Sequence, residues 1–266
     1  MRAFLARDLR VTVSYRMQFF MRILSILVVV TTLFFVSKIF AGATSSQFAQ
    51  WRDPLAAWLT GLAVLNYFMT GFSSLANAIR EEQLQGTLES VLLTPISVPT
   101  MIVASSAWDF VQATFFSFLY LFFGWLFFDV QYRGNVLLAL MFLVLTTAVL
   151  ASLGILSASF TMVFKRGDPF GIFLGTGSAL FSGVFFPTEL ISRYAGGVMS
   201  SISRILPPTY GLDGIRRVLI EGQSFSQVRE PLVTLLVFLA LLLPFSLWVF
   251  GRAVRRAKRE GSLIQY

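Results

Sequence analysis

Six long blocks of apolar residues divide this chain and constrain its fold more than any other feature of the sequence. They cover residues 23–41, 55–79, 100–128, 134–164, 169–187 and 231–251. A helix crosses the hydrocarbon core of a bilayer with about 20 predominantly apolar residues, so each block is long enough for one crossing. Only 13% of the 266 residues are charged, which is too few to cover the core of a soluble protein. The sequence therefore predicts an all-α, polytopic membrane protein with six transmembrane helices.

Two basic segments flank the six-helix domain, 23–251. The N-terminal segment, 1–22, mixes arginines with apolar side chains, which favours an amphipathic helix lying in the lipid headgroup layer. An irregular basic tail that only sets the topology is the alternative. The C-terminal tail, 252–266, is also rich in Lys and Arg. Because these residues concentrate on the cytoplasmic side of membrane proteins, we expect both termini in the cytoplasm and the chain in the cytoplasmic membrane of a prokaryote.

Several classes of functional site are excluded by composition. The chain contains no His and no Cys, which excludes zinc sites built on those residues, Cys nucleophiles and Ser-His-Asp triads. It has no Gly-x-x-x-x-Gly-Lys-Ser/Thr loop, so it does not bind ATP through that motif. The net charge is +8, but the basic residues lie beside apolar blocks, where anionic lipid is a better counter-charge than nucleic acid. We therefore expect no catalytic, metal or cofactor site in this chain.

The connection between the second and third blocks is the most informative polar segment. Residues 79–93 can form a helix, because Leu84, Leu88 and Leu92 recur at helical spacing. The charged face of this helix would hold Arg80, Glu81, Glu82 and Glu89. A mostly acidic face is unusual for a loop pressed against anionic lipid, so docking onto another protein is one interpretation. A solvated amphipathic connector is the other, and physical reasoning from the residues leaves both open.

The sequence of this segment, EEQLQGTLESVLLTPIS, resembles the cytoplasmic loop of exporter permeases of the ABC-2 type. The matching residues are Glu82, Gly86, Thr87, Leu88, Glu89, Leu92, Leu93, Thr94 and Pro95. In that family the loop is a coupling helix that inserts into a cleft of the ATPase subunit. The resemblance therefore implies that residues 79–95, with Arg80 and Glu81 at their start, couple this chain to an ATPase.

A second match follows the fifth apolar block. The matching residues are Gly183, Pro187, Leu206, Pro207, Thr209, Tyr210, Asp213 and Arg216. The segment 187–222 is too polar for a comfortable full span, and irregular backbone at membrane depth needs shielding by protein or by a water cavity. We therefore expect a re-entrant or interfacial hairpin on the outer side before the last span, as the resemblance also implies.

The resemblance covers nearly the whole chain and implies its partners. Two ATPase subunits would carry ATP and Mg, and a second copy of this chain or a related permease would complete the pathway within the membrane lipids. Spans two and five would line the route with polar side chains, here Asn66, Tyr67, Thr70, Ser73, Ser178 and Ser182. The cargo is expected to be lipid-like, amphipathic or drug-like, and a lipid-linked glycan is a further candidate.

A secondary transporter or channel that acts alone is the alternative function. Proton- and ion-coupled carriers usually need carboxylates or His within the membrane, and Asp109 is the only candidate in the blocks. That residue lies either inside the third span or at its cytoplasmic interface. A membrane-embedded enzyme is a third class, but the spans offer no plausible set of catalytic groups.

Overall fold

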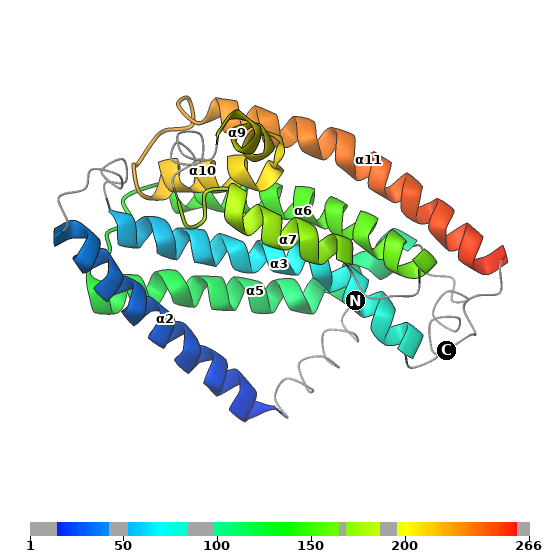
Figure 1. Cartoon of the computed structure of the whole chain (residues 1–266), viewed down its shortest axis with the longest axis horizontal. Coiled ribbons are helices and arrows are strands. Elements are labelled where there is room, and N and C mark those ends of the chain that lie inside the picture. Colours follow the sequence, from blue (N-terminus) through cyan, green and yellow to red (C-terminus); the bar gives the residue numbers. More distant parts are fainter. Residues whose placement is uncertain (1–14, 43–52, 85–97, 165–168, 187–195, 260–266) are drawn as a thin grey trace.

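The computed structural model describes residues 15–42, 53–84, 98–164, 169–186 and 196–259, whose helices form an elongated bundle (Figure 1). In chain order the helices are α2 (Arg16–Gly42), α3 (Pro54–Leu84), α5 (Val98–Phe128), α6 (Val136–Phe164), α7 (Pro169–Phe181), α9 (Gly196–Ile205), α10 (Pro207–Leu219) and α11 (Arg229–Arg259). The described residues contain no strand. The prediction of an all-α protein is therefore confirmed.

Five helices of the described residues are long and apolar enough to cross a membrane: α2, α3, α5, α6 and α11. They coincide with five of the six predicted spans. The block 169–187 differs, because its helix, α7, ends at Phe181 after 13 residues, a length of about 20 Å at 1.5 Å per residue. The hydrocarbon core is about 30 Å thick, so α7 is shorter than one crossing within the described residues, and the fifth of the six predicted spans stays a prediction.

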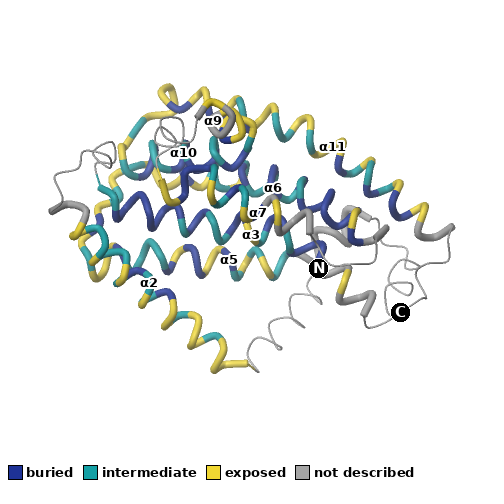
Figure 2. Tube along the Cα trace, viewed as in Figure 1, coloured by how far each residue is buried: buried dark blue, intermediate teal, exposed yellow. Residues whose placement is uncertain are grey.

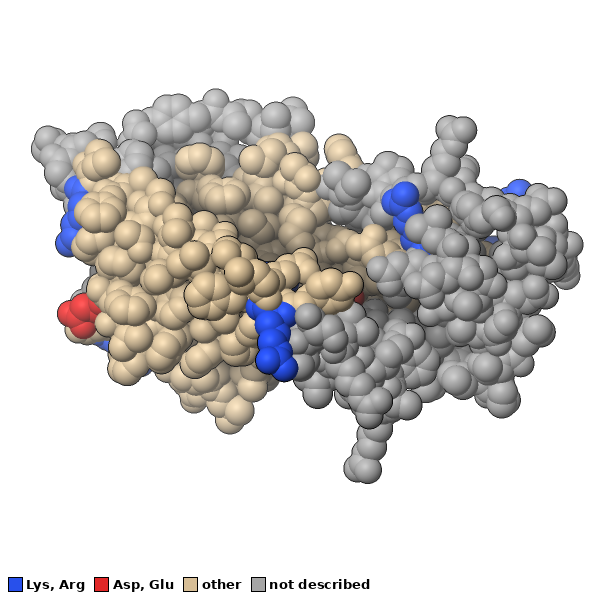
Figure 3. All heavy atoms as spheres, turned by 90° about the horizontal axis from the view of Figure 1, so that it is seen from below, with Lys and Arg blue, Asp and Glu red and all other residues tan. Residues whose placement is uncertain are grey.

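Large apolar side chains cover the outside of the bundle. Phe127, Val144 and Leu241, on three different helices, are each more than half exposed. Seen from below, the described surface is almost entirely uncharged, with only isolated Lys, Arg, Asp or Glu side chains (Figure 3). Lipid chains are the solvent that suits such a surface. With its five apolar helices, the chain is a multi-pass membrane protein.

Helix α3 lies at the centre of the bundle (Figure 2). It packs against α5, α6 and α7, while α11 packs on α6 and α2 lies along α5 and α3. Of its apolar window 72% is buried, against 11–33% for the other four spans, although its window is the least hydrophobic of the five. The lipid-facing side of a helix must be apolar, whereas a helix enclosed by protein can carry polar and small residues on all sides. Its lower hydropathy therefore reflects its central position.

The crossing of α3 and α6 depends on two glycines. A Cβ added to Gly71 would lie 2.7 Å from Cβ of Leu150, and one added to Gly154 would overlap the carbonyl oxygen of Gly71. Small residues allow helix backbones to approach closely in membranes, where hydrophobic burial does not hold helices together. These two glycines therefore allow the backbones of α3 and α6 to approach closely where the helices cross.

Polar residues in the turns set where two of the spans begin. The Asp53 carboxylate accepts a hydrogen bond from the Ala56 backbone N–H at 3.1 Å, and Pro54 follows it as the first residue of α3. This is the usual N-cap followed by proline. The Asn135 side-chain oxygen likewise accepts from the Leu137 N–H at 2.9 Å, which caps α6.

Two helices run through predicted domain boundaries. Helix α2 begins at Arg16, inside the N-terminal segment 1–22, and continues without a break into the first span. Helix α11 continues to Arg259, inside the predicted tail 252–266. The interfacial role of residues 1–22 stays a prediction, because residues 1–14 lie outside the described residues.

Candidate functional site

A polar cluster joins α2, α3 and α5 beside the middle of α3. The Asn66 side-chain amide donates to the Ala113 carbonyl at 3.0 Å and lies 3.3 Å from the Ser117 hydroxyl. Its oxygen accepts a hydrogen bond from Arg22 at 3.3 Å. The Arg22 guanidinium also lies over the Phe116 ring, 3.9 Å from its centroid. An arginine that the sequence assigns to the headgroup layer therefore contacts the polar groups of two neighbouring helices.

The hydroxyls of the other predicted pathway residues of α3 form hydrogen bonds of two kinds. The Tyr67 hydroxyl lies 2.6 Å from Thr114 Oγ1 on α5. Thr70 and Ser73 instead donate to carbonyls four residues earlier in α3, at 2.9 and 2.7 Å. Serine and threonine commonly make this bond in helices. Asn66 and Tyr67 are thus engaged with α5, and the roles of all four residues in a pathway stay predictions.

Ser178 lies in the last turn of α7 and Ser182 directly after its end, and both are buried. The Ser182 hydroxyl donates to the Ser178 carbonyl, while the Ser178 hydroxyl has no hydrogen-bond partner among the described residues. Helix α7 packs against α3, and a Cβ added to Gly175 would lie 3.2 Å from Sδ of Met69. The two helices assigned to the route are therefore neighbours, with Met69 at their contact.

Arg216 connects α10 to the start of α3 and to the turn after α7. Its guanidinium donates to the Ala57 carbonyl at 2.8 and 3.2 Å, to the Gly183 carbonyl at 2.6 Å and to the Val184 carbonyl at 3.0 Å. Gly183 has a φ of 83°, a conformation that glycine adopts at little cost. A Cβ on Gly61 would lie 2.9 Å from this guanidinium, so that glycine leaves the space. The sequence singles out Gly183 and Arg216, but not the contact between them.

The rest of the predicted outer hairpin forms α9, α10 and the turn between them. Pro207 is buried and is the first residue of α10, and the Tyr210 hydroxyl donates to the Arg204 carbonyl at 2.8 Å. Asp213 forms an ion pair with Arg217 at 2.9 Å, a residue that the sequence pattern did not single out. Pro187 lies outside the described residues. The re-entrant character of the hairpin stays a prediction.

The predicted coupling segment begins inside α3. This helix extends to Leu84, so Arg80, Glu81 and Glu82 lie in its last turns, and Arg80 is exposed. The other predicted residues lie outside the described residues: Gly86, Thr87, Leu88, Glu89, Leu92, Leu93, Thr94 and Pro95. Asp109 lies in α5 near the start of its apolar window, which begins at Ala107, and is exposed.

Comparison with known protein families gives a match over most of the chain. A family model described as ABC-2 type transporter matches residues 1–220, which is most of the chain. No curated protein matches the sequence.

Proposed function

The chain belongs to the ABC-2 type transporter family, and on that basis we propose that this permease is the membrane subunit of an ATP-driven exporter. A separate ATPase supplies the energy, with two copies per complex. A second copy of the permease, or a related one, completes the pathway. The cargo is a lipid-like, amphipathic or drug-like molecule, with a lipid-linked glycan as a further candidate, and the chain itself catalyses no reaction.

The observation that carries this proposal is the continuity of α3. Its 31 residues run from Pro54 to Leu84 without a break, a length of about 46 Å. One end contains Arg80, Glu81 and Glu82 of the coupling segment, and the middle contains the polar cluster around Asn66. A rigid helix of this kind can carry a displacement from an ATPase to the centre of the membrane.

The coupling works by biasing two arrangements of the bundle. ATP-driven closure of the two ATPases pushes on residues 79–95 and shifts α3 along or across its axis. Because α3 packs against α5, α6 and α7, those helices must follow or slide. Interfaces of packed helices adopt discrete arrangements, so a small push selects one state rather than bending the bundle.

The orientation follows from where the charged segments attach. Helices α3, α6 and α11 end at one end of the bundle, on the right in Figure 1. Helix α11 ends inside the basic tail 252–266, and the Lys165–Arg166 pair follows the end of α6 in the sequence. Basic residues favour the cytoplasmic side. We place that end in the cytoplasm of a prokaryotic cell, together with both termini and the ATPases.

Charge reversal in the coupling segment tests the proposal. A tagged full-length chain is recovered from its host's membranes, and the ABC ATPase that accompanies it is quantified by mass spectrometry and by ATP hydrolysis. The double variant Glu82→Lys/Glu89→Lys should recover at least tenfold less ATPase, with normal membrane insertion. Glu221→Lys is the matched control, since Glu221 is exposed in the turn between α10 and α11. Equal recovery with the double variant, or no ATPase with the unmodified chain, would contradict the proposal.

A further inference from the structure

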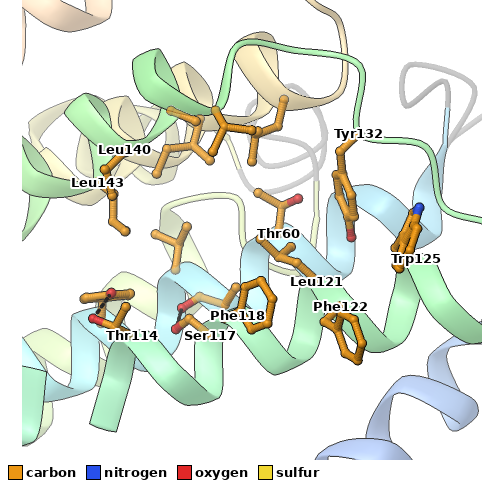
Figure 4. Close-up of a pocket in the computed structure, with 17 residues that line it drawn as sticks. Thr60, Thr114, Ser117, Phe118, Leu121, Phe122, Trp125, Tyr132, Leu140 and Leu143 are labelled. Carbon is orange, nitrogen blue, oxygen red and sulfur yellow. Dashed lines mark hydrogen bonds between the residues drawn. The ribbon is translucent and has the colours of Figure 1, made fainter. Parts of the chain in front are cut away.

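A cavity of about 380 Å³ lies between α3, α5, α6 and α10 (Figure 4). Ala63 and Val64 of α3 contribute to its floor, and its walls include Phe118 of α5 and Leu140 of α6. No charged residue is among the described residues that line it. Its lining therefore suits a hydrocarbon group.

Exposed lining residues on α5 and α6 indicate that the cavity opens sideways between these two helices. Both helices pack against α3, but they make little contact with each other in the described residues. At the mouth, Phe118 is 58% exposed and Leu140 is 50% exposed. These helices cross the bilayer, so the mouth faces lipid chains rather than water.

Two hydroxyls in the cavity have no hydrogen-bond partner among the described residues. Thr60 Oγ1 and Tyr132 Oη are buried and unpaired, and both residues line the cavity. Figure 4 shows them at the same end, together with Trp125, while Thr114 and Ser117 lie toward the other end. Leaving a buried hydroxyl unpaired is costly, so an acceptor supplied by a bound molecule would be favoured there.

Tyr132 places this polar end near the membrane surface. It lies in the turn between Phe128, where α5 ends, and Val136, where α6 begins. Burial raises the pKa of Tyr132, so its hydroxyl keeps its proton and can donate. The ester groups of phospholipids lie at this depth, between the headgroups and the hydrocarbon core.

We propose that one acyl chain of a bilayer phospholipid occupies this cavity, with its ester carbonyl accepting a hydrogen bond from Thr60 or Tyr132. A cavity of about 150 Å³ holds the six carbons of benzene, so 380 Å³ gives room for roughly 15 carbons, the length of an acyl chain. The headgroup stays outside, beside the turn that contains Tyr132. The lipid is resident and fills the space between α5 and α6. This inference rests on the membrane placement of the chain and not on its coupling to an ATPase.

Photolabelling in vesicles tests the proposal. The full-length chain is reconstituted without ATPase in phosphatidylethanolamine and phosphatidylglycerol, with a trace of phospholipid that carries a diazirine on one acyl chain. We expect labelling of cavity residues such as Phe118 and Leu140 above that of Leu241, which is exposed on α11. A diazirine near the ester should label close to Trp125, and one near the chain end should label close to Leu143. Equal labelling of Leu241, or no dependence on the position of the diazirine, would overturn the proposal.

Removing the two hydroxyls tests their role. The double variant Thr60→Val/Tyr132→Phe keeps the shape of both side chains and should lower cavity labelling about three- to tenfold, the factor expected for hydrogen bonds within a membrane. Thr147→Val is the matched control, because Thr147 also has a buried, unpaired hydroxyl but does not line the cavity. Unchanged labelling in the double variant would contradict the hydrogen bonds. If labelling appeared only after addition of a hydrolysing ATPase, the occupant would be a transported molecule and the resident lipid would be excluded.

Discussion

Replacing Arg216 with alanine should destabilise the protein far more than replacing its neighbour in the chain. The Arg216 guanidinium bonds three backbone carbonyls, those of Ala57, Gly183 and Val184. Gly183 and Val184 are buried, so water cannot replace the guanidinium there. The variant therefore leaves acceptors without donors and separates α10 from the start of α3.

The magnitude follows from the number of carbonyls. At about 1–1.5 kcal/mol for each lost hydrogen-bonded group, three groups give a loss of about 3–5 kcal/mol in Arg216→Ala. Arg216→Lys keeps the charge but lacks the planar fork that reaches several carbonyls, so we expect a loss of about 2 kcal/mol. Arg217 pairs with Asp213 across one helical turn, with 36% and 41% of the two side chains exposed. Arg217→Ala should then cost only about 0.3–0.5 kcal/mol.

Unfolding of the full-length chain by SDS in mixed micelles measures these differences. Trp58 is a suitable fluorescent reporter, because its indole N–H donates to the Phe185 carbonyl at 2.9 Å, one residue beyond the turn that Arg216 holds. We expect the transition midpoints to fall in the order wild type, Arg217→Ala, Arg216→Lys, Arg216→Ala. Comparisons of this kind are uncertain by about 0.5 kcal/mol. If Arg216→Ala and Arg217→Ala lower the free energy of unfolding by amounts that agree within that uncertainty, Arg216 is not the residue that connects these elements.

Two further predictions concern the centre of the bundle. Gly154→Leu should lower the free energy of unfolding by about 1–3 kcal/mol, the usual cost of overpacking, and so lower the SDS midpoint, because any side chain there meets the Gly71 carbonyl. Gly177→Ala is the control, since nothing lies within 4 Å of its added Cβ. Asn66→Leu should cost about 1–2 kcal/mol and release Arg22, which a faster reaction of Arg22 with a guanidine-specific reagent would detect. An unchanged midpoint in Gly154→Leu, or unchanged reactivity of Arg22, would contradict the respective contact.

The hydropathy of the sequence is sufficient to locate the five long helices, but not the residue at which α7 ends. The segment after Phe181 is still apolar, so a window of residues extends the span to 187. What ends the regular structure is the turn at Gly183, whose carbonyl is bonded by Arg216, 33 residues later. Such a long-range contact has no signature in local composition.

The contacts of Arg22 also could not be predicted from local sequence. The arginines of residues 1–22 look interfacial when that segment is considered alone. The structure gives Arg22 a hydrogen-bond acceptor on α3 and an aromatic ring on α5, and neither contact follows from the spacing of residues within the segment. By contrast, the central position of α3 could have been inferred, because its span is the least hydrophobic and holds Asn66, Tyr67, Thr70 and Ser73.

The position of α3 relates the packing of the bundle to the proposed coupling. At one end Arg216 bonds the Ala57 carbonyl, which ties α3 to α10 and to the turn after α7. In the middle, the glycine crossing holds α3 against α6. At the other end the helix continues to Leu84, beyond its apolar window, and provides the first residues of the proposed coupling segment. Under the proposed function, a push at that end would act on α7 and α10 through their contacts with α3. The proposed coupling requires that α3 remain rigid, and a long unbroken helix enclosed by protein at the centre of the bundle meets this requirement.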